Sequence, residues 1–166
     1  MCTQPLFYDH TISENGIVTG PNGIIMPFDF NRYAGVCIHG RKYYVHRLLA
    51  HVFVPNPRPD IFTLVDHIDR DKTNNSISNL RWSNYALNGL NTDAKNAYFV
   101  KKWKKWHAKV RGKTLGYYKT FEKAHEVSKK YRINLLETSY KDLCENTQDS
   151  SSMYFVETRR CPTLAF

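Results

Sequence analysis

The chain is short and rich in apolar residues: its 166 residues are 42% hydrophobic and 14% aromatic, which suits one ordinary domain or two small ones and excludes general disorder. Its formal net charge of +9 favours a polyanionic partner. Four scattered cysteines without a Cys-x-x-Cys pair disfavour a zinc site and suit a reducing compartment.

The N-terminal sequence shows no signal peptide, because it lacks a basic start followed by an apolar core. No apolar run is long enough to cross a bilayer. We therefore expect a soluble intracellular protein without a membrane partner.

The first part of the chain, to about Val45, is predicted to form short strands and turns. Asn15-Gly16 and Asn22-Gly23 are turn signals flanked by apolar residues, and two further strands meet at His39-Gly40. The next stretch, HRLLAHVFV, has the apolar spacing of a short helix, which the prolines of PNPRP end. His46 and His51 lie five residues apart, which disfavours a shared metal site; we assign them core or surface roles, or a phosphate contact for His46.

The segment LVDHIDRDKTNNSISNLRWSNYALN follows. TLVDHI predicts a strand, DRDKTNNSISN a loop, and LRW a second strand. SNYALNGLNTDAK predicts a helix with Ser83 as its N-cap, weakened by Gly89.

The C-terminal part predicts a second unit and a tail. AYFV, WHAKV and LGYY are expected strands, and TFEKAHEVSKKYRINLL an expected helix capped by Thr120. Between Lys95 and Arg132 there are 13 basic and 2 acidic residues, a net charge of +11, so the attraction for an anion is concentrated here. The tail from Thr138 is expected to be partly mobile, with MYFVETRR as a strand or a frayed end.

Asp66 and His67 are the candidate chemical groups. At the end of a strand both side chains can reach one cavity, and Asn88 on the next helix offers an amide oxygen. A hard cation such as Mg²⁺ needs only one or two protein oxygens when phosphate and water supply the others, and a neutral imidazole can take a proton from water. This set predicts a phosphodiester hydrolase.

The stretch VDHIDRDKTNNSISNLRWSNYALN resembles the HNH nuclease motif of the ββα-metal fold, and HRLLAHVFVPNP and NGIV resemble its phage homing endonuclease branch. The resemblance covers about Ile12 to Asn91. It implies that His67 is the general base, that Asp66 and Asn88 hold the metal, and that Asn79, grouped with His67 as catalytic, holds the loop by hydrogen bonds. The sequence departs from the motif at two positions: Arg70 replaces a frequent glycine and Leu87 a frequent glutamate.

The stretch WHAKVRGKTLGYYKTFEKAHEV resembles an AP2-type DNA-binding domain, in which a three-stranded antiparallel sheet packs on one helix. The resemblance implies that the sheet enters the major groove, although lysines replace the usual arginines of the first strand, so base reading should be modest. For Trp103 the sequence leaves two alternatives open, a place in the core or a contact with DNA. The expected DNA-binding residues are Arg70, Lys72, Arg81, Lys101, Lys102, Trp103, Lys104, Lys105, Lys109, Arg111 and Lys113.

Together these features predict an α+β protein in three parts: a β-rich HNH domain over 1–95, an AP2-like domain over 96–137 and a tail over 138–166. The expected function is cutting of double-stranded DNA by a monomer or a dimer, nicking one strand per active site, with one divalent ion, Mg²⁺ or else Mn²⁺, and no zinc. The main alternative is a DNA-binding regulator with an inactive HNH scaffold, and a third is an RNA-processing nuclease.

Overall fold

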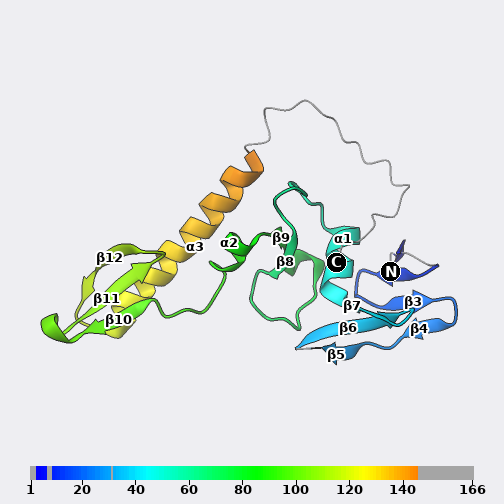
Figure 1. Cartoon of the computed structure of the whole chain (residues 1–166), viewed down its shortest axis with the longest axis horizontal. Helices are drawn as coiled ribbons and strands as arrows, with labels where there is room; N and C mark the ends of the chain where they lie inside the picture. Colours follow the sequence, from blue (N-terminus) through cyan, green and yellow to red (C-terminus); the bar gives the residue numbers. More distant parts are fainter. Residues whose placement is uncertain (1–2, 7–8, 31, 146–166) are drawn as a thin grey trace. The chain divides into compact units, whose positions relative to one another are not determined.

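The computed structural model describes residues 3–6, 9–30 and 32–145 (Figure 1). By its internal contacts the described chain forms two compact units, one ending at Trp82 and the other spanning Ser83–Glu145. None of the helices described is long and apolar enough to span a membrane.

The first unit is built from antiparallel sheets and one short helix. Its sheets have the strand orders β1-β2-β3-β4, β5-β6-β7 and β8-β9. The strands are β1 (Thr3–Pro5), β2 (Thr11–Ser13), β3 (Val18–Gly20), β4 (Gly23–Ile25), β5 (Phe28–Phe30), β6 (Tyr33–Ile38), β7 (Arg41–Tyr44), β8 (Leu64–His67) and β9 (Leu80–Ser83). The helix α1 spans Val45–Phe53, and a 3-10 turn, η1 (Ile77–Asn79), precedes β9.

The predicted turns of this unit are confirmed. His39 and Gly40 both have positive φ, +47° and +76°, which is the conformation of a two-residue hairpin turn that matches the twist of its strands. Gly16, in the turn between β2 and β3, has φ of +77°, a region that glycine enters without steric cost. Asn22-Gly23 likewise connects β3 to β4.

The core of the first unit holds α1 against the sheets. Its buried members come from β2, β3, β6, β7, α1 and β9: Ile12, Val18, Val36, Ile38, Tyr43, Val45, Leu48, Leu49 and Leu80. The Trp82 indole N–H donates to the carbonyl of Val54, just beyond the end of α1, at 2.8 Å. This bond fastens β9 to the helix and so fixes the end of the polar loop that leads into β9.

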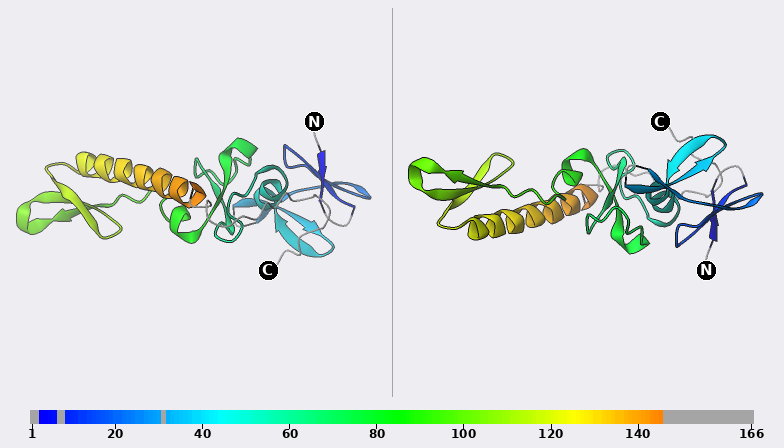
Figure 2. Two further views of the ribbon diagram at one scale, coloured as in Figure 1. Left: turned by 90° about the horizontal axis from the view of Figure 1, so that it is seen from above. Right: turned by 90° about the horizontal axis from the view of Figure 1, so that it is seen from below.

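The second unit contains the predicted three strands and helix. Its elements are α2 (Tyr85–Asn88), β10 (Ala97–Val100), the 3-10 turn η2 (Lys101–Trp103), β11 (Lys105–Val110), β12 (Lys113–Tyr118) and α3 (Phe121–Glu145). Small residues, Ala97 and Ala108 on the sheet and Ala124 on α3, let helix and sheet approach closely. Figure 2 shows the first half of α3 lying beside the sheet, and its later turns extend past it.

Three local predictions for this unit are wrong. The N-cap of α2 is Asn84 rather than Ser83: its side-chain oxygen accepts the Leu87 N–H at 2.9 Å. The helix expected from Ser83 onward is only the four residues of α2. The last helix continues to Glu145 instead of ending near Leu136, so the first part of the expected tail is helical.

Two other outcomes concern the ends of α3. The predicted cap at Thr120 is confirmed, since its hydroxyl accepts the Lys123 N–H at 3.3 Å. The stretch MYFVETRR lies outside the described residues.

Candidate functional site

Asp66 and His67 lie together at the end of β8, and both are buried, with 7% and 4% of their surface exposed. Their neighbours Leu64 and Val65 are half-buried. Burying a carboxylate and an imidazole is costly unless each has hydrogen-bonding partners. The hydrogen-bonding partners of Asp66 and His67 therefore determine which chemical roles the two side chains can take.

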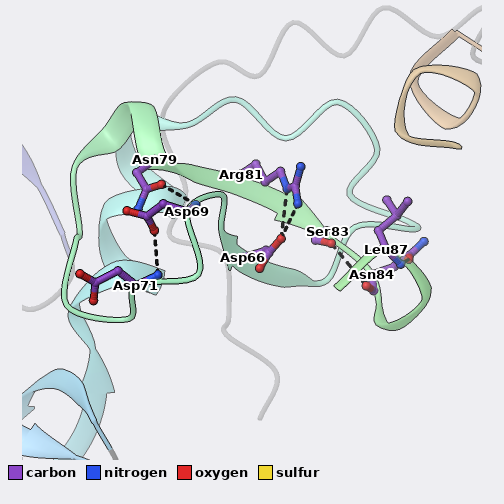
Figure 3. Close-up of polar contacts among 8 residues, drawn as sticks. All are labelled: Asp66, Asp69, Asp71, Asn79, Arg81, Ser83, Asn84 and Leu87. Carbon is purple, nitrogen blue, oxygen red and sulfur yellow. Dashed lines mark hydrogen bonds and ion pairs between the residues drawn. The ribbon is translucent and has the colours of Figure 1, made fainter. Parts of the chain in front are cut away.

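The partner of Asp66 is Arg81, on the neighbouring strand β9. Both Nε and Nη2 of Arg81 donate to Asp66 Oδ2, at 3.1 and 2.7 Å, and the two side chains are only 17% and 8% exposed (Figure 3). A charge-assisted fork of this kind fixes the orientation of the carboxylate. Arg81 was expected to bind DNA, whereas in the structure its guanidinium pairs with Asp66.

His67 is held by an asparagine of the loop. Its Nε2 lies 3.0 Å from Asn75 Oδ1. Because an amide oxygen can only accept, Nε2 must carry the ring proton and donate it, which leaves the lone pair of the neutral ring on Nδ1. Sequence reasoning missed Asn75, and its only signal was the density of asparagines in this loop.

A second imidazole packs against His67. The ring centroid of His46, on α1, lies 5.0 Å from that of His67 and 4.8 Å from that of Tyr33. Burial, together with the electrostatic influence of His67, Arg47 and Lys72, lowers the pKa of His46 to about 3. Among the described residues, His46 Nδ1 has no hydrogen-bond partner. His46 is therefore a neutral core residue, as one of the sequence alternatives had it.

Asn79 braces the loop between β8 and β9. Its Oδ1 accepts the Asp69 N–H at 3.0 Å, and its Nδ2 donates to Asp69 Oδ1 at 2.9 Å (Figure 3). The same Nδ2 also donates to the Asn74 carbonyl at 2.8 Å. The amide hydrogen bonds of Asn74 and Asn79 lower the pKa of Asp69, and the Thr73 hydroxyl does the same for Asp71. Both carboxylates thus stay ionised while they order the loop.

The two departures from the motif have structural explanations. Arg70 has φ of +70°, in the left-handed region that glycine enters without cost, so the frequent glycine at this position is a conformational choice. Leu87 is 2% exposed and supplies the apolar side of α2. Lys72, another residue expected to bind DNA, has its Nζ 4.5 Å from the centre of the Tyr33 ring.

The remaining expected residues belong to the second unit. Asn88, at the end of α2, is exposed. The expected DNA contacts from Lys101 to Lys113 are all exposed as well: Lys101, Lys102, Trp103, Lys104, Lys105, Lys109, Arg111 and Lys113. Arg111 also donates to the carbonyl of Ala86, which ties the β11–β12 turn to α2.

The two expected metal ligands are each of a type that a hard divalent cation accepts. A carboxylate at Asp66 and an amide oxygen at Asn88 are the ligand types that Mg²⁺ and Mn²⁺ accept. Within the described part of the chain, no group of three or more His, Cys, Asp or Glu side chains is placed to hold a metal ion. Phosphate and water would have to complete the shell.

Comparisons with known proteins agree with the motif. Residues 43–90 match the family model described as HNH endonuclease. The chain is 35% identical over 89 residues to "Uncharacterized HNH endonuclease L245" of Acanthamoeba polyphaga mimivirus, which covers 50% of this chain and 26% of that relative. The chain thus spans about a quarter of that relative's length.

A solved structure is also similar. It is titled "DNA binding and cleavage by the HNH homing endonuclease I-HmuI", with 27% identity over 55% of this chain and 57% of that one and a TM-score of 0.47. The match of residues 43–90 includes Asp66, His67, Asn79 and Asn88. Residues 43–90 are thus similar to HNH endonuclease domains.

Proposed function

We propose that the chain is a homing-type DNA endonuclease that hydrolyses phosphodiester bonds in double-stranded DNA with the help of a divalent ion. The observation that carries this proposal is the buried pair Asp66 and His67 at the end of β8, each held by a specific partner. One such site per chain attacks one strand at a time, so a monomer nicks and a dimer can cut both strands.

His67 is the general base of the proposed reaction. With Nε2 donating to Asn75, Nδ1 takes a proton from a water molecule as the water oxygen attacks phosphorus. The new P–O bond forms in line with the bond to the 3′ oxygen, which breaks. The leaving 3′ oxygen then takes a proton from solvent, and the strand ends in a 3′ hydroxyl and a 5′ phosphate.

Asp66 and Asn88 would hold the divalent ion, Mg²⁺ or Mn²⁺. When bound, such an ion offsets negative charge on the attacked phosphate and on the leaving oxygen. Arg81 keeps the Asp66 carboxylate in one orientation. Asn79 holds the loop that carries Asn75 and so positions His67 through it.

The second unit is proposed to supply most of the affinity for DNA. The segment from Lys95 to Arg132 carries a net charge of +11, and its lysines from 101 to 113 are exposed. Neutralising phosphates releases counterions, so binding should weaken steeply as salt rises. The resemblance to an AP2-type DNA-binding domain supports the same role.

One observation favours the alternative of a DNA-binding regulator. The Arg81 guanidinium already neutralises the carboxylate that would bind the metal, as a scaffold without catalytic activity would require. A nuclease needs Asp66 to bind a cation in place of part of its pairing with Arg81, whereas a regulator does not. An assay of DNA cutting decides between the two functions.

The test uses supercoiled plasmid with Mg²⁺ or with EDTA. We expect metal-dependent conversion to open circle by the wild type and by His39→Asn, a matched change of an exposed histidine at a positive-φ turn. His67→Ala should lose the conversion but keep binding in a gel shift. Equal, salt-sensitive binding without cutting by any of the proteins would favour the regulator, and cutting that persists in His67→Ala would show that another group is the base.

A further inference from the structure

The outer face of the β10-β11-β12 sheet carries a row of aromatic side chains. Tyr98, His107 and Tyr117 are direct cross-strand partners, so their side chains point to the same face of the sheet. The opposite face carries Ala97 and Ala108, which pack on α3. The row therefore points away from the helix.

Trp103 completes this row from the turn between β10 and β11. Its ring meets Tyr117 edge to face with centroids 4.7 Å apart, and His107 stacks on Tyr117 at 4.6 Å with 16° between the planes. His107 Nε2 also lies 3.1 Å from the Thr114 hydroxyl. We call Tyr98, Trp103, His107 and Tyr117 the outer aromatic row.

The row is exposed although its rings are large and apolar. Tyr98, Trp103 and Tyr117 keep 57%, 50% and 41% of their surface exposed. Rings that served only the core of the unit would be covered, as Ala97 and Ala108 are. The stacking and edge contacts hold the rings of Trp103, His107 and Tyr117 in place, so a ligand that stacks on them costs these side chains little entropy.

The charge around the row fits a polyanion. Along β11 the outward positions alternate as Lys105, His107 and Lys109, and the adjoining turn adds Lys101, Lys102 and Lys104. The sequence from Ala97 to Tyr118 contains no aspartate or glutamate. Lysines beside flat rings match a strand whose phosphates are anionic and whose bases have aromatic faces.

Unpaired bases fit this face better than a duplex does. In a duplex the base faces are stacked on one another, and the edges are read by arginine, asparagine or glutamine. The strands β10, β11 and β12 contain none of these three residues. Two strand spacings put Tyr98 and Tyr117 roughly 10 Å apart, enough for a sheet to stack two or three splayed bases.

We infer that the outer aromatic row binds single-stranded DNA by stacking unpaired bases, with Lys105 and Lys109 on the flanking phosphates. The choice of DNA rests on the proposed nuclease function, and the strand loosened at a nick would be its natural source. The row would then hold a cut strand near the protein, in addition to any contact that the unit makes with duplex.

Binding of labelled oligonucleotides by the full chain in EDTA tests the inference without any cutting. The probes are one mixed-sequence DNA strand, its duplex and the RNA strand of the same sequence. We expect Tyr98→Leu to weaken binding of the DNA strand by roughly 5- to 150-fold, the range for loss of one stacked base, with duplex binding little changed. Tyr98→Phe keeps the ring and should keep the affinity.

Two controls separate stacking from general effects. Tyr85→Leu removes a ring that is 81% exposed elsewhere in the unit and should change nothing. Bound single strand should quench tryptophan fluorescence, and Trp103→Phe should remove the quenching because Trp82 is buried and Trp106 half-buried.

Three results would overturn the inference: equal losses for strand and duplex in Tyr98→Leu, no loss in that variant, or tighter binding of the RNA strand. Because no step in this assay needs metal, the result stands apart from the plasmid assay. If the protein does not cut plasmid but the outer aromatic row still binds single strands, only the proposed nuclease function is contradicted.

Discussion

Replacing Arg81 with methionine removes the charge that neutralises Asp66 while keeping most of the aliphatic stem. The carboxylate would then be buried without its charge partner, since the side chain of Asp66 is only 8% exposed. Breaking a buried pair from one side costs about 3–5 kcal/mol. The 17% exposure of Arg81 gives water some access, so we expect about 3 kcal/mol, the lower end of that range.

Urea unfolding followed by tryptophan fluorescence measures this loss, because the buried Trp82 lies next to Arg81 in the same strand. In the double variant Arg81→Met with Asp66→Asn the stranded charge is gone, so about 1 kcal/mol or more should return as a coupling energy. Arg58→Met breaks the pair with Asp60, whose side chain is 61% exposed, and serves as the matched control, with a much smaller change expected.

Addition of Mg²⁺ extends the same experiment. A ligand at a hundred times its Kd stabilises the folded state by about 2.7 kcal/mol. If the ion uses the carboxylate that Arg81 holds, Mg²⁺ should stabilise Arg81→Met more than the wild type, because the ion then supplies the missing positive charge. A loss below about 1 kcal/mol in Arg81→Met, with simple additivity in the double variant, would refute this account of the pair.

Three more changes test the loop and its surroundings. Asn79→Ala removes the hydrogen bonds to the Asp69 amide and the Asn74 carbonyl, so the free energy of unfolding should fall by about 1–3 kcal/mol. The Asp69 amide hydrogen should also exchange faster with solvent, and an unchanged exchange rate would contradict the bracing role of Asn79. The folded state keeps His46 neutral down to a pKa of about 3, whereas the unfolded chain protonates near 6.5, so stability should fall by about 1.4 kcal/mol per pH unit as pH drops below 6.5. His46→Phe should flatten that part of a pH series of urea midpoints, and an identical acid slope would argue against it. Arg70→Gly relieves a positive φ and should raise the free energy of unfolding by about 0.5 kcal/mol or more, and a loss in urea melts would mean that the Arg70 side chain stabilises the loop.

Local signals predicted the elements that depend on local chemistry. The turn at His39-Gly40 follows from residues that accept positive φ, and α1 follows from the spacing of Leu48, Leu49, Val52 and Phe53. The three strands of the second unit could also be predicted from the sequence, because their short apolar stretches are separated by lysines and by a turn that contains glycine.

The misses depend on contacts between distant residues or on competing local choices. Arg81 and Asp66 are 15 residues apart, and pairing of two strands alone brings them together. Ser83 and Asn84 are both good caps, and the burial of Ser83 leaves the role to Asn84. Neither glycine nor proline follows Leu136 before Glu145, so nothing ends α3 there, although its polar composition suggested a tail.

The hydrogen-bonded loop between β8 and β9 has a consequence for the timing of the reaction. Ordering the backbone of one residue costs about 1–2 kcal/mol of conformational entropy, and the loop from Asp69 to Ser76 is long enough for that cost to be large. Here the bonds from Asp69, Asp71, Asn74 and Asn79 fix it while the protein folds. In the proposed reaction, arriving DNA would meet His67 already in position, so the rate of cutting should not depend on the closing of this loop.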